Sequence, residues 1–421
     1  MGNFVKYKNR ILILSLLIIT CIVCLLIFYP INKKNNNINL LCSDEIRGGF
    51  DIGSGATKIQ IAKVKSCNNG DIFLEKVYYK NNKPVKYSQD LAEHKNQYFS
   101  QNIIQEGVKA MAALKEEGLQ KLKEQCGNDC KVDVWRGIMT EAFRKAENWD
   151  EARQQLSQAV DGILIKRLNQ KEEALYGFYP ITKLKDFDKN QYVVWDMGGG
   201  STQITAFDST FTRNNFNNNG AKVIETDLGS SSFCNFLTNI IYSNERDSAK
   251  KLNPINHYDY LEQYSKKYIQ NKIDYSIQKD TEMTNDFNKL YNNKKYIVIG
   301  GLLSISLPEV MKAIDPEYNR NDYATIKNIS DVRPIKKDEL KTIYSKLKQM
   351  SDIELQSFAQ KIGMNTHYSK VTASNLLLVL NYMESSLNID NIIPISTDGT
   401  DSILLSHEVN NDTYWRHDTL L

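Results

Sequence analysis

Two stretches decide the fold of this chain: Asp51-Ile52-Gly53-Ser54-Gly55 and Asp196-Met197-Gly198-Gly199-Gly200-Ser201-Thr202. Apolar and polar residues alternate on both sides of the first glycine turn, over 49–52 and 58–64, and strands are predicted on both sides of the second, at 192–196 and 202–207. Alternation on both sides of a glycine turn is typical of a β-hairpin. The second half of the chain therefore opens as the first does, and the two halves form an internal repeat.

The segments between and after these turns alternate between strands and helices. Apolar spacing predicts, in order, a helix over 102–125, a strand at 131–135, a helix at 150–160, a strand at 163–166, a helix over 171–178 and a linker at Pro180. The second cycle is predicted as strands at 192–196, 202–207, 222–228 and 296–301, a hairpin tip at 214–220, helices at 337–350 and 373–387, a strand at 392–396 and a closing helix from Thr397. Two βαβ-type halves with equivalent turns place both turns at one cleft, so we expect an α/β protein.

The length of the chain supports two domains. Its 421 residues exceed one ordinary core, and two domains of roughly 150 to 200 residues each are expected. We predict a linker over 31–45, a domain I over 46–178 that also includes 396–410, and a domain II over 179–395.

The charge of the body is close to neutral. The formal net charge is +3, but residues 1–40 contribute five basic side chains and no acidic one, which leaves 48 basic and 50 acidic side chains beyond them. No basic stripe or aromatic-basic motif accompanies this balance. A nucleic-acid partner is therefore not expected.

An apolar run near the N-terminus predicts a membrane segment. From Ile11 to Tyr29 nineteen residues carry no charge, and as a helix they would span about 28 Å, close to the thickness of a bilayer core. We predict a signal anchor over 11–30 and not a cleaved signal peptide, whose apolar core is only about 7 to 15 residues long. The basic residues within 1–10 favour a cytoplasmic N-terminus, with the body outside the cytoplasm, in the periplasm if the source is bacterial.

Seven cysteines divide into two within the apolar run and five beyond it. Cys126 and Cys130 could close a small loop in an oxidising compartment, or they could be unconnected thiols. Beyond the apolar run no CxxC pair or His-Cys cluster indicates a zinc site.

The glycine turns are suited to binding phosphate. A glycine turn between strands exposes backbone N–H groups and admits a phosphate that a side chain would block. Asp51 and Asp196 precede the turns at strand ends, where a carboxylate can hold hydrated Mg²⁺ that offsets phosphate charge. No GxxxxGK[ST], GxSxG or HExxH sequence offers another chemistry.

Together, the two stretches resemble the phosphate-binding segments of the actin, Hsp70 and sugar kinase superfamily. Residues 139–148 are similar to the Ala-Thr-Ser-Ala-x-Arg segment of the exopolyphosphatase and guanosine pentaphosphate phosphatase (Ppx/GppA) family, and residues 170–174 are similar to its glutamate-rich segment. The likeness continues through 227–230 and Gly300-Gly301 to about Leu405. It implies two actin-like ATPase domains, of the ribonuclease H-like kind, that flank a cleft.

The resemblance also implies roles for individual residues. Glu173 falls on the glutamate that orients or deprotonates the attacking water, and Arg144 falls on an arginine near the phosphates. The implied metal-site residues are Asp51, Asp196 and Gln203, with Mg²⁺ as the expected ion and Mn²⁺ as an alternative. The implied phosphate-binding residues are Gly53, Ser54, Gly55, Thr140, Gly198, Gly199, Gly200, Ser201, Thr202, Gly300 and Gly301.

Some positions depart from the family pattern. Gln203 stands where the family usually has glutamate, as in the extracellular apyrases, and Glu141 replaces a small polar residue. The first turn reads Ser54-Gly55-Ala56 where the family more often has serine-asparagine-serine. These departures bear on the substrate more than on the reaction.

We therefore expect Mg²⁺-dependent hydrolysis of terminal phosphoanhydride bonds, with inorganic polyphosphate as the substrate. Guanosine pentaphosphate and, in an apyrase-like reaction, nucleoside triphosphates are the alternatives. A membrane-tethered sensor that binds phosphate polymers or nucleotides without turnover is the alternative of another class. The expected partners are the substrate, the membrane through 11–30, and a second copy of the chain in a homodimer.

Overall fold

The computed structural model describes residues 41–68, 72–94, 96–210, 220–244, 255, 259–312, 314–362 and 372–406. The chain divides into two compact units, Met1–Cys42 with Cys67–Asn69, and Ser43–Ser66 with Gly70–Leu421. Except for Cys42 and Cys67, both β-sheets lie in the second unit.

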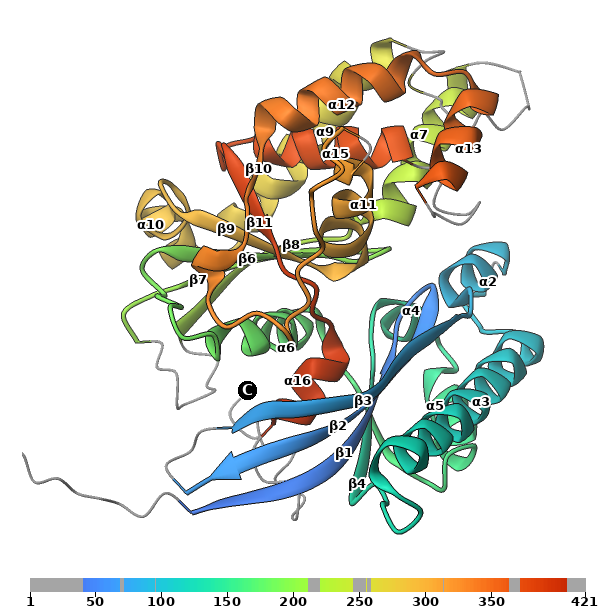
Figure 1. The fold of residues 1–421 in the computed structure, drawn as a ribbon. Coiled ribbons are helices and arrows are strands. Elements are labelled where there is room, and N and C mark those ends of the chain that lie inside the picture. The colour runs from blue at the N-terminus through green and yellow to red at the C-terminus, as the bar shows by residue number, and fades with distance from the viewer. Residues whose placement is uncertain are drawn as a thin grey trace, which may run out of the picture. The chain divides into compact units, whose positions relative to one another are not determined.

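The first sheet has five strands in the order β3-β2-β1-β4-β5 (Figure 1). Their bounds are β1 Cys42–Ile52, β2 Ala56–Cys67, β3 Ile72–Pro84, β4 Val134–Met139 and β5 Leu164–Arg167. β3 runs antiparallel to β2, whereas β4 and β5 run parallel to β1. The accompanying helices are α2 Tyr87–Glu93, α3 Gln101–Cys126, α4 Glu141–Lys145 and α5 Trp149–Gln158.

The long helix α3 confirms the helix predicted over 102–125. Ser100 caps it by accepting a hydrogen bond from Ile103 N, and its apolar residues fall on one face. This face packs with α5 and with Phe50 and Ile59 of the sheet in one hydrophobic core. Burial of this face closes one side of the first sheet.

The second sheet has six strands in the order β10-β11-β9-β6-β7-β8. Their bounds are β6 Tyr192–Met197, β7 Thr202–Phe207, β8 Ala221–Thr226, β9 Lys295–Ile299, β10 Ile335–Lys336 and β11 Asn391–Pro394. The accompanying helices are α7 Ser230–Asn244, α9 Tyr260–Gln278, α10 Thr281–Tyr291, α11 Leu307–Lys312, α12 Lys337–Gln349, α13 Asp352–Lys361 and α15 Thr372–Met383, with a π-helix at Gly301–Ser306 and a 3-10 helix at Ile329–Asp331. A hydrophobic core joins Trp195 and Ile204 of this sheet to α9, α12 and α15.

Two further helices, α6 Gln170–Thr182 and α16 Gly399–Leu405, pack against each other. Apolar residues of α6 and α16 share a core with Val194 of β6 and Ala62 of β2. These two helices therefore link elements of both sheets.

The two sheets repeat one topology, as the glycine turns predict. The strands β3-β2-β1-β4-β5 and β8-β7-β6-β9-β11 have the same order. In each set a hairpin and a third antiparallel strand lie on one side, and two strands parallel to the first lie on the other. β10 is an added antiparallel edge strand.

The predicted linker at Pro180 is wrong, because α6 continues through Pro180 to Thr182. Proline has no N–H to bond the carbonyl four residues before it, which here is Tyr176. The Ser402 hydroxyl of α16 donates to that carbonyl instead. The helix therefore passes the proline without an unsatisfied acceptor there.

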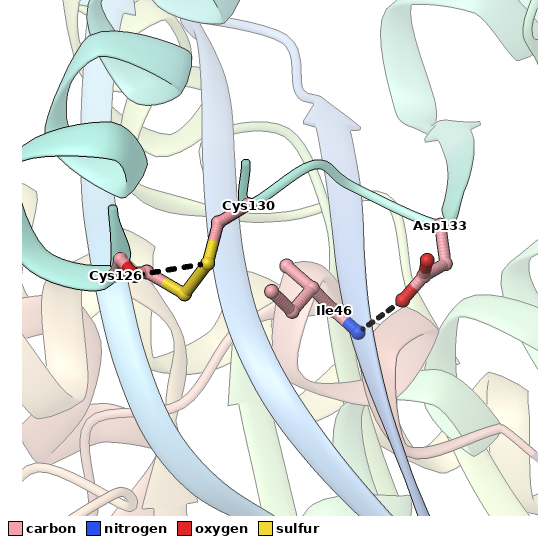
Figure 2. The surroundings of a disulfide bond; sticks show 4 residues. All are labelled: Ile46, Cys126, Cys130 and Asp133. Carbon is pink, nitrogen blue, oxygen red and sulfur yellow. Dashed lines mark hydrogen bonds between the residues drawn. A yellow bond between two sulfur atoms is a disulfide. The ribbon is translucent and has the colours of Figure 1, made fainter. Parts of the chain in front are cut away.

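Two predicted boundaries shift for identifiable reasons. β1 begins at Cys42, inside the predicted linker 31–45, where Cys42 is bonded to Cys67 of β2. The strand predicted at 131–135 is β4, which begins at Val134. Asp133 N donates to the Ile46 carbonyl at 2.7 Å and its carboxylate accepts from Ile46 N at 2.8 Å, so strand pairing starts after this clamp (Figure 2).

The structure contains two disulfide bonds among its described residues, Cys42–Cys67 and Cys126–Cys130 (Figure 2 shows the second). The first was not foreseen from the sequence, and the second resolves the alternative left open there. Disulfides persist in oxidising compartments.

Replacing Cys42 and Cys67 with serine is expected to lower the free energy of unfolding by about 2 to 4 kcal/mol, because the crosslink restricts the unfolded chain. The double variant Cys126→Ser, Cys130→Ser is the control, since it opens a loop with a sequence separation of 4 instead of 25 and should lose less. Denaturant unfolding of the oxidised chain measures both. Equal losses would contradict the loop-length argument.

In the part of the chain that the structure describes, no helix is both long and apolar enough to cross a membrane. The predicted signal anchor at 11–30 and the N-terminal segment 1–10 lie outside the described residues, as does most of the hairpin tip predicted at 214–220.

Candidate active site

The two glycine turns close with the same hydrogen bond. Gly53 N donates to the Ala56 carbonyl at 2.9 Å, and Gly198 N donates to the Ser201 carbonyl at 3.0 Å. The intervening amides meet no hydrogen-bond acceptor among the described residues, and they belong to Ser54, Gly55, Gly199 and Gly200. Each turn therefore presents bare main-chain donors, the groups that phosphate oxygens accept from.

The start of α7 supports the second turn. Ser230 N donates to the Gly198 carbonyl at 3.1 Å, and Ser231 N donates to the Gly199 carbonyl at 2.7 Å. Glycine is required at Gly229, because a Cβ there would collide with the main chain of the turn. The segment 227–230, which carries part of the resemblance, is thus a buttress for the turn.

Thr202 belongs to the same support. Its hydroxyl donates to the Leu228 carbonyl at 2.6 Å, and its side chain is fully buried. The hydroxyl of Thr202 therefore ties the second turn to the segment before α7. Ser201 is also buried, and its hydroxyl accepts a hydrogen bond from Gln203 Nε2 at 3.1 Å.

Asp196 lies at the end of β6 between two glycines. A Cβ on Gly300 would lie 2.6 Å from Asp196 Oδ1, and one on Gly177 of α6 would lie 2.8 Å from Oδ2. Gly300 also has φ of 87°, which other residues rarely adopt. Both positions thus need glycine for the main chain to approach this carboxylate. Gly301 follows as the first residue of the π-helix, and a Cβ there would meet no atom within 4 Å.

The Asp196 carboxyl is surrounded by negative charge. Burial, reinforced by the nearby carboxylate of Glu173, raises the pKa of Asp196 to about 7. Asp51 and Asp398 add to this repulsion, whereas Lys58 opposes it. The surroundings of Asp196 therefore favour its protonated, uncharged form.

Asp51, at the end of β1, carries a partner that the sequence reasoning missed. Lys58 Nζ lies 2.9 Å from Asp51 Oδ2, and the two side chains are 32% and 8% exposed. Burial opposes the charge of Lys58, but the carboxylates of Asp51 and Asp398 outweigh it and raise the pKa of Lys58.

Lys58 is the counterpart of Gln203. In the second hairpin Asp196 pairs directly with Gln203 across the strands. A turn closed between Gly53 and Ala56 sets Asp51 opposite Lys58 in the same way. Counting the hairpin register from the glycine turn would have found this residue in the sequence.

A second group of charges joins the site from the start of α16. Lys80 Nζ of β3 lies 3.0 Å from Asp401 and 3.5 Å from Asp398. Burial disfavours the Asp398 carboxylate, but Lys80 and Lys58 outweigh burial and lower the pKa of Asp398. The sequence places Asp398 only at a helix start, where its side chain indeed accepts from Thr400 N.

Arg144 and Glu173 form the central ion pair. Arg144 Nη1 donates to Glu173 Oε2 at 2.6 Å and to the Leu168 carbonyl at 3.3 Å. The side chains are 19% and 17% exposed. Burial raises the pKa of Glu173, although Arg144 opposes the shift.

Glu173 is not needed to cap its helix. The capping box of α6 is formed by Asn169 and Glu172. Glu172 also pairs with Lys166 at 3.0 Å. The two adjacent glutamates therefore have separate surroundings, and Glu173 alone among them contacts Arg144.

Glu141, the first residue of α4, lies against both turns. Its carboxylate accepts hydrogen bonds from Ser54 Oγ at 2.5 Å, from Ser88 Oγ at 3.0 Å and from Lys145 Nζ. A Cβ on Gly200 would collide with this carboxylate. Thr140, immediately before it, is buried and donates its N–H to the Ile52 carbonyl at 3.2 Å.

The charges of this region fit a divalent cation. Six carboxyl groups face four basic groups here; the acids are Asp51, Glu141, Glu173, Asp196, Asp398 and Asp401, and the basic residues are Lys58, Lys80, Arg144 and Lys145. Within the described ranges no group of three or more His, Cys, Asp or Glu side chains is placed to hold a metal ion by itself. Mg²⁺ commonly takes one or two carboxylates and completes its shell with waters and substrate phosphates. Asp51, Asp196 and Gln203 offer the oxygen donors that such an ion prefers.

Comparisons with known proteins bear on this arrangement. A model of the Ppx/GppA phosphatase family matches residues 76–217. No curated protein sequence matches the chain. Among solved structures, a Ppx/GppA family member from Aquifex aeolicus is similar with 13% identity and a TM-score of 0.59, over 86% of this chain and 97% of that chain.

Two other solved structures have the same fold. An exopolyphosphatase from Cytophaga hutchinsonii is 12% identical with a TM-score of 0.59, over 90% of this chain and 99% of that chain. Nucleoside triphosphate hydrolases from Neospora caninum are 12% identical with a TM-score of 0.50, over 91% and 96%. The fold is therefore the actin-like one, and members of the Ppx/GppA family are phosphoanhydride hydrolases. The family match over residues 76–217 and the shared fold together confirm the resemblance that the motifs indicated.

Proposed function

We propose that this chain is a Mg²⁺-dependent exopolyphosphatase that hydrolyses the terminal phosphoanhydride bond of inorganic polyphosphate. The observation that carries the proposal is the half-buried ion pair of Glu173 with Arg144, whose glutamate acts electrostatically with Asp51 and Asp196, the acids of the two glycine turns. Phosphoryl transfer needs charge neutralisation and in-line positioning more than covalent help. The site has basic and main-chain N–H groups for charge neutralisation and a carboxylate, Glu173, for positioning the attacking water.

The bare amides of the turns are the proposed cradle for the terminal phosphates. Arg144 supplies positive charge beside them and fixes the orientation of Glu173. Glu173 orients the attacking water and accepts its proton as the water oxygen bonds to phosphorus. The anhydride oxygen then leaves with the shortened chain, and orthophosphate is released. General-base assistance of this kind contributes about 10² to 10⁴ in rate.

Asp51, Asp196 and Gln203 are the residues proposed to hold Mg²⁺. When bound, the ion would neutralise phosphate charge and act as a Lewis acid on a phosphoryl oxygen. The excess of carboxylates and the raised pKa of Asp196 support a cation at this place.

Nucleoside triphosphate hydrolysis is the second candidate. Gln203, which replaces the usual glutamate, and the fold shared with the Neospora caninum nucleoside triphosphate hydrolases favour it. Guanosine pentaphosphate is a substrate only if the body faces the cytoplasm. We propose that it does not, because the two disulfides suit an oxidising compartment and agree with an anchor at 11–30.

Phosphate release by the purified full-length chain from polyphosphate, ATP and guanosine pentaphosphate tests the proposal, with and without Mg²⁺. We expect polyphosphate to give the highest kcat/KM and EDTA to abolish turnover. A preference for ATP would establish the second candidate. Binding without turnover on all three would instead identify a sensor.

A further inference from the structure

Glu141 occupies an unusual place for an acid. It lies at the end of β4 and the start of α4, it is 6% exposed, and its carboxylate lies between Ser54 of the first turn and Gly200 of the second. Both turns are the proposed phosphate cradle. A negative charge therefore sits where the proposed function requires a phosphate to bind.

The contacts of this carboxylate are those of a bound oxyanion. Two hydroxyls, Ser54 Oγ and Ser88 Oγ, and one ammonium, Lys145 Nζ, donate to it. Ser88 is held in place because its N–H donates to the Ser54 carbonyl at 3.0 Å. Carboxylate and phosphoryl oxygens accept the same charge-assisted hydrogen bonds.

The carboxylate remains charged in this pocket. Burial works against ionisation, but Lys145 and the hydroxyls of Ser54 and Ser88 outweigh it and lower the pKa of Glu141. The charge of Glu141 also acts on Glu173 and contributes to raising its pKa. The pocket is thus within electrostatic range of the proposed base.

We propose that Ser54, Ser88 and Lys145 form a binding pocket for the terminal phosphoryl group, and that the Glu141 carboxylate fills this pocket until substrate displaces it. Glu141 is then an internal competitor for the substrate, and Ser88 and Lys145 are additional substrate-binding residues. The inference rests on the proposed function for the identity of the ligand, an oxyanion of phosphorus. Gly200, whose amide is bare, lies against the same carboxylate, and Gly55 directly follows Ser54 in the chain.

Glu141→Ser removes the competitor and places the small polar residue of the family pattern at this position. Isothermal titration calorimetry with orthophosphate and with tripolyphosphate should show dissociation constants about tenfold lower than for the unaltered chain, the size of one screened like-charge repulsion. Ser88→Ala and Lys145→Ala should change the dissociation constants in the opposite direction, each by about tenfold or more. Glu117→Ser is the matched control, because Glu117 also accepts from a hydroxyl and an ammonium, those of Tyr79 and Lys83, and neither of these two residues belongs to a glycine turn.

Weaker or equal binding by Glu141→Ser would overturn the proposal, as would unchanged binding by both Ser88→Ala and Lys145→Ala. Should Glu141→Ser not fold, Glu141→Gln tests the same charge with nearly the same volume. The titrations are made in EDTA, where the proposed Mg²⁺-dependent turnover does not occur, so the two proposals fail separately. A tighter-binding Glu141→Ser in a chain that hydrolyses nothing would refute only the hydrolase, and turnover without tighter binding would refute only the internal competitor.

Discussion

Glu173→Gln is expected to lower kcat for phosphate release by about 10² to 10⁴ while leaving the dissociation constant for tripolyphosphate within a few-fold of its original value. The amide has the shape of the carboxylate and still accepts from Arg144, but it accepts no proton from water. Binding depends on the turns and on Arg144, which the substitution leaves in place. Steady-state kinetics and calorimetry on the same preparation measure both quantities.

The adjacent residue gives the control for this experiment. Glu172→Gln removes an equal charge one position away, where the side chain caps α6 and pairs with Lys166. We expect it to cost about 1 kcal/mol of stability and to leave kcat nearly unchanged. A kcat for Glu173→Gln close to that of the unaltered chain would remove Glu173 from the reaction.

Asp196→Asn is expected to change activity and stability in opposite directions. Turnover should fall by about 10² to 10³, because one of the proposed cation-holding carboxylates is lost. Stability of the metal-free chain at pH 8 should rise, because the substitution removes a charge that burial and Glu173 both disfavour. Replacing a residue that serves structure alone would not stabilise the chain.

The direction of the stability change in Asp196→Asn follows from the raised pKa of Asp196. Its pKa is about 7 in the folded chain and has an ordinary value of 3.8 in the unfolded one, so the folded chain binds the proton more tightly. The stability lost by ionising Asp196 in the folded chain is zero below about pH 4. This loss grows as the pH rises and reaches at most about 4 kcal/mol above pH 7. Asp196→Asn should therefore gain stability at pH 8 and none at pH 4, as measured by denaturant unfolding in EDTA.

Asp186→Asn is the matched control for this prediction. Asp186 accepts from Ile329 N at 2.6 Å and from Ser330 N at 2.9 Å, and these bonds outweigh burial and lower its pKa. We expect this variant to lose stability at pH 8 and to keep its turnover. Loss of stability by Asp196→Asn at pH 8, with normal turnover, would identify Asp196 as a structural residue.

Local pattern was sufficient for the architecture. Each glycine turn is flanked by alternating residues that pair with each other, so hairpin, register and the position of the acid all follow from adjacent sequence. The helix over 102–125 was equally visible, because its apolar face repeats along one segment. Pro180 misled the prediction because the Tyr176 carbonyl, which Pro180 cannot bond, accepts a hydrogen bond from Ser402, 226 residues away in sequence.

The site itself was only partly visible. The acids and glycines were named because they belong to the turns, whereas Glu141 was noticed only as a departure from the family pattern. Its contact with Gly200 and the pairing of Lys80 with Asp401, 321 residues apart, depend on how distant elements pack. Nothing in the neighbouring sequence specifies such a pair.

The amino-acid sequence by itself determined the two acid-bearing hairpins and the repeated fold, because strand alternation and glycine turns are properties of neighbouring residues. Only the tertiary structure decided that Arg144 pairs with Glu173 and that Glu141 lies between the turns. It also decided that Lys58 and Lys80 lower the pKa of Asp398. Those contacts join residues on different elements, so their distances, burial and pKa values are set by packing and not by sequence spacing.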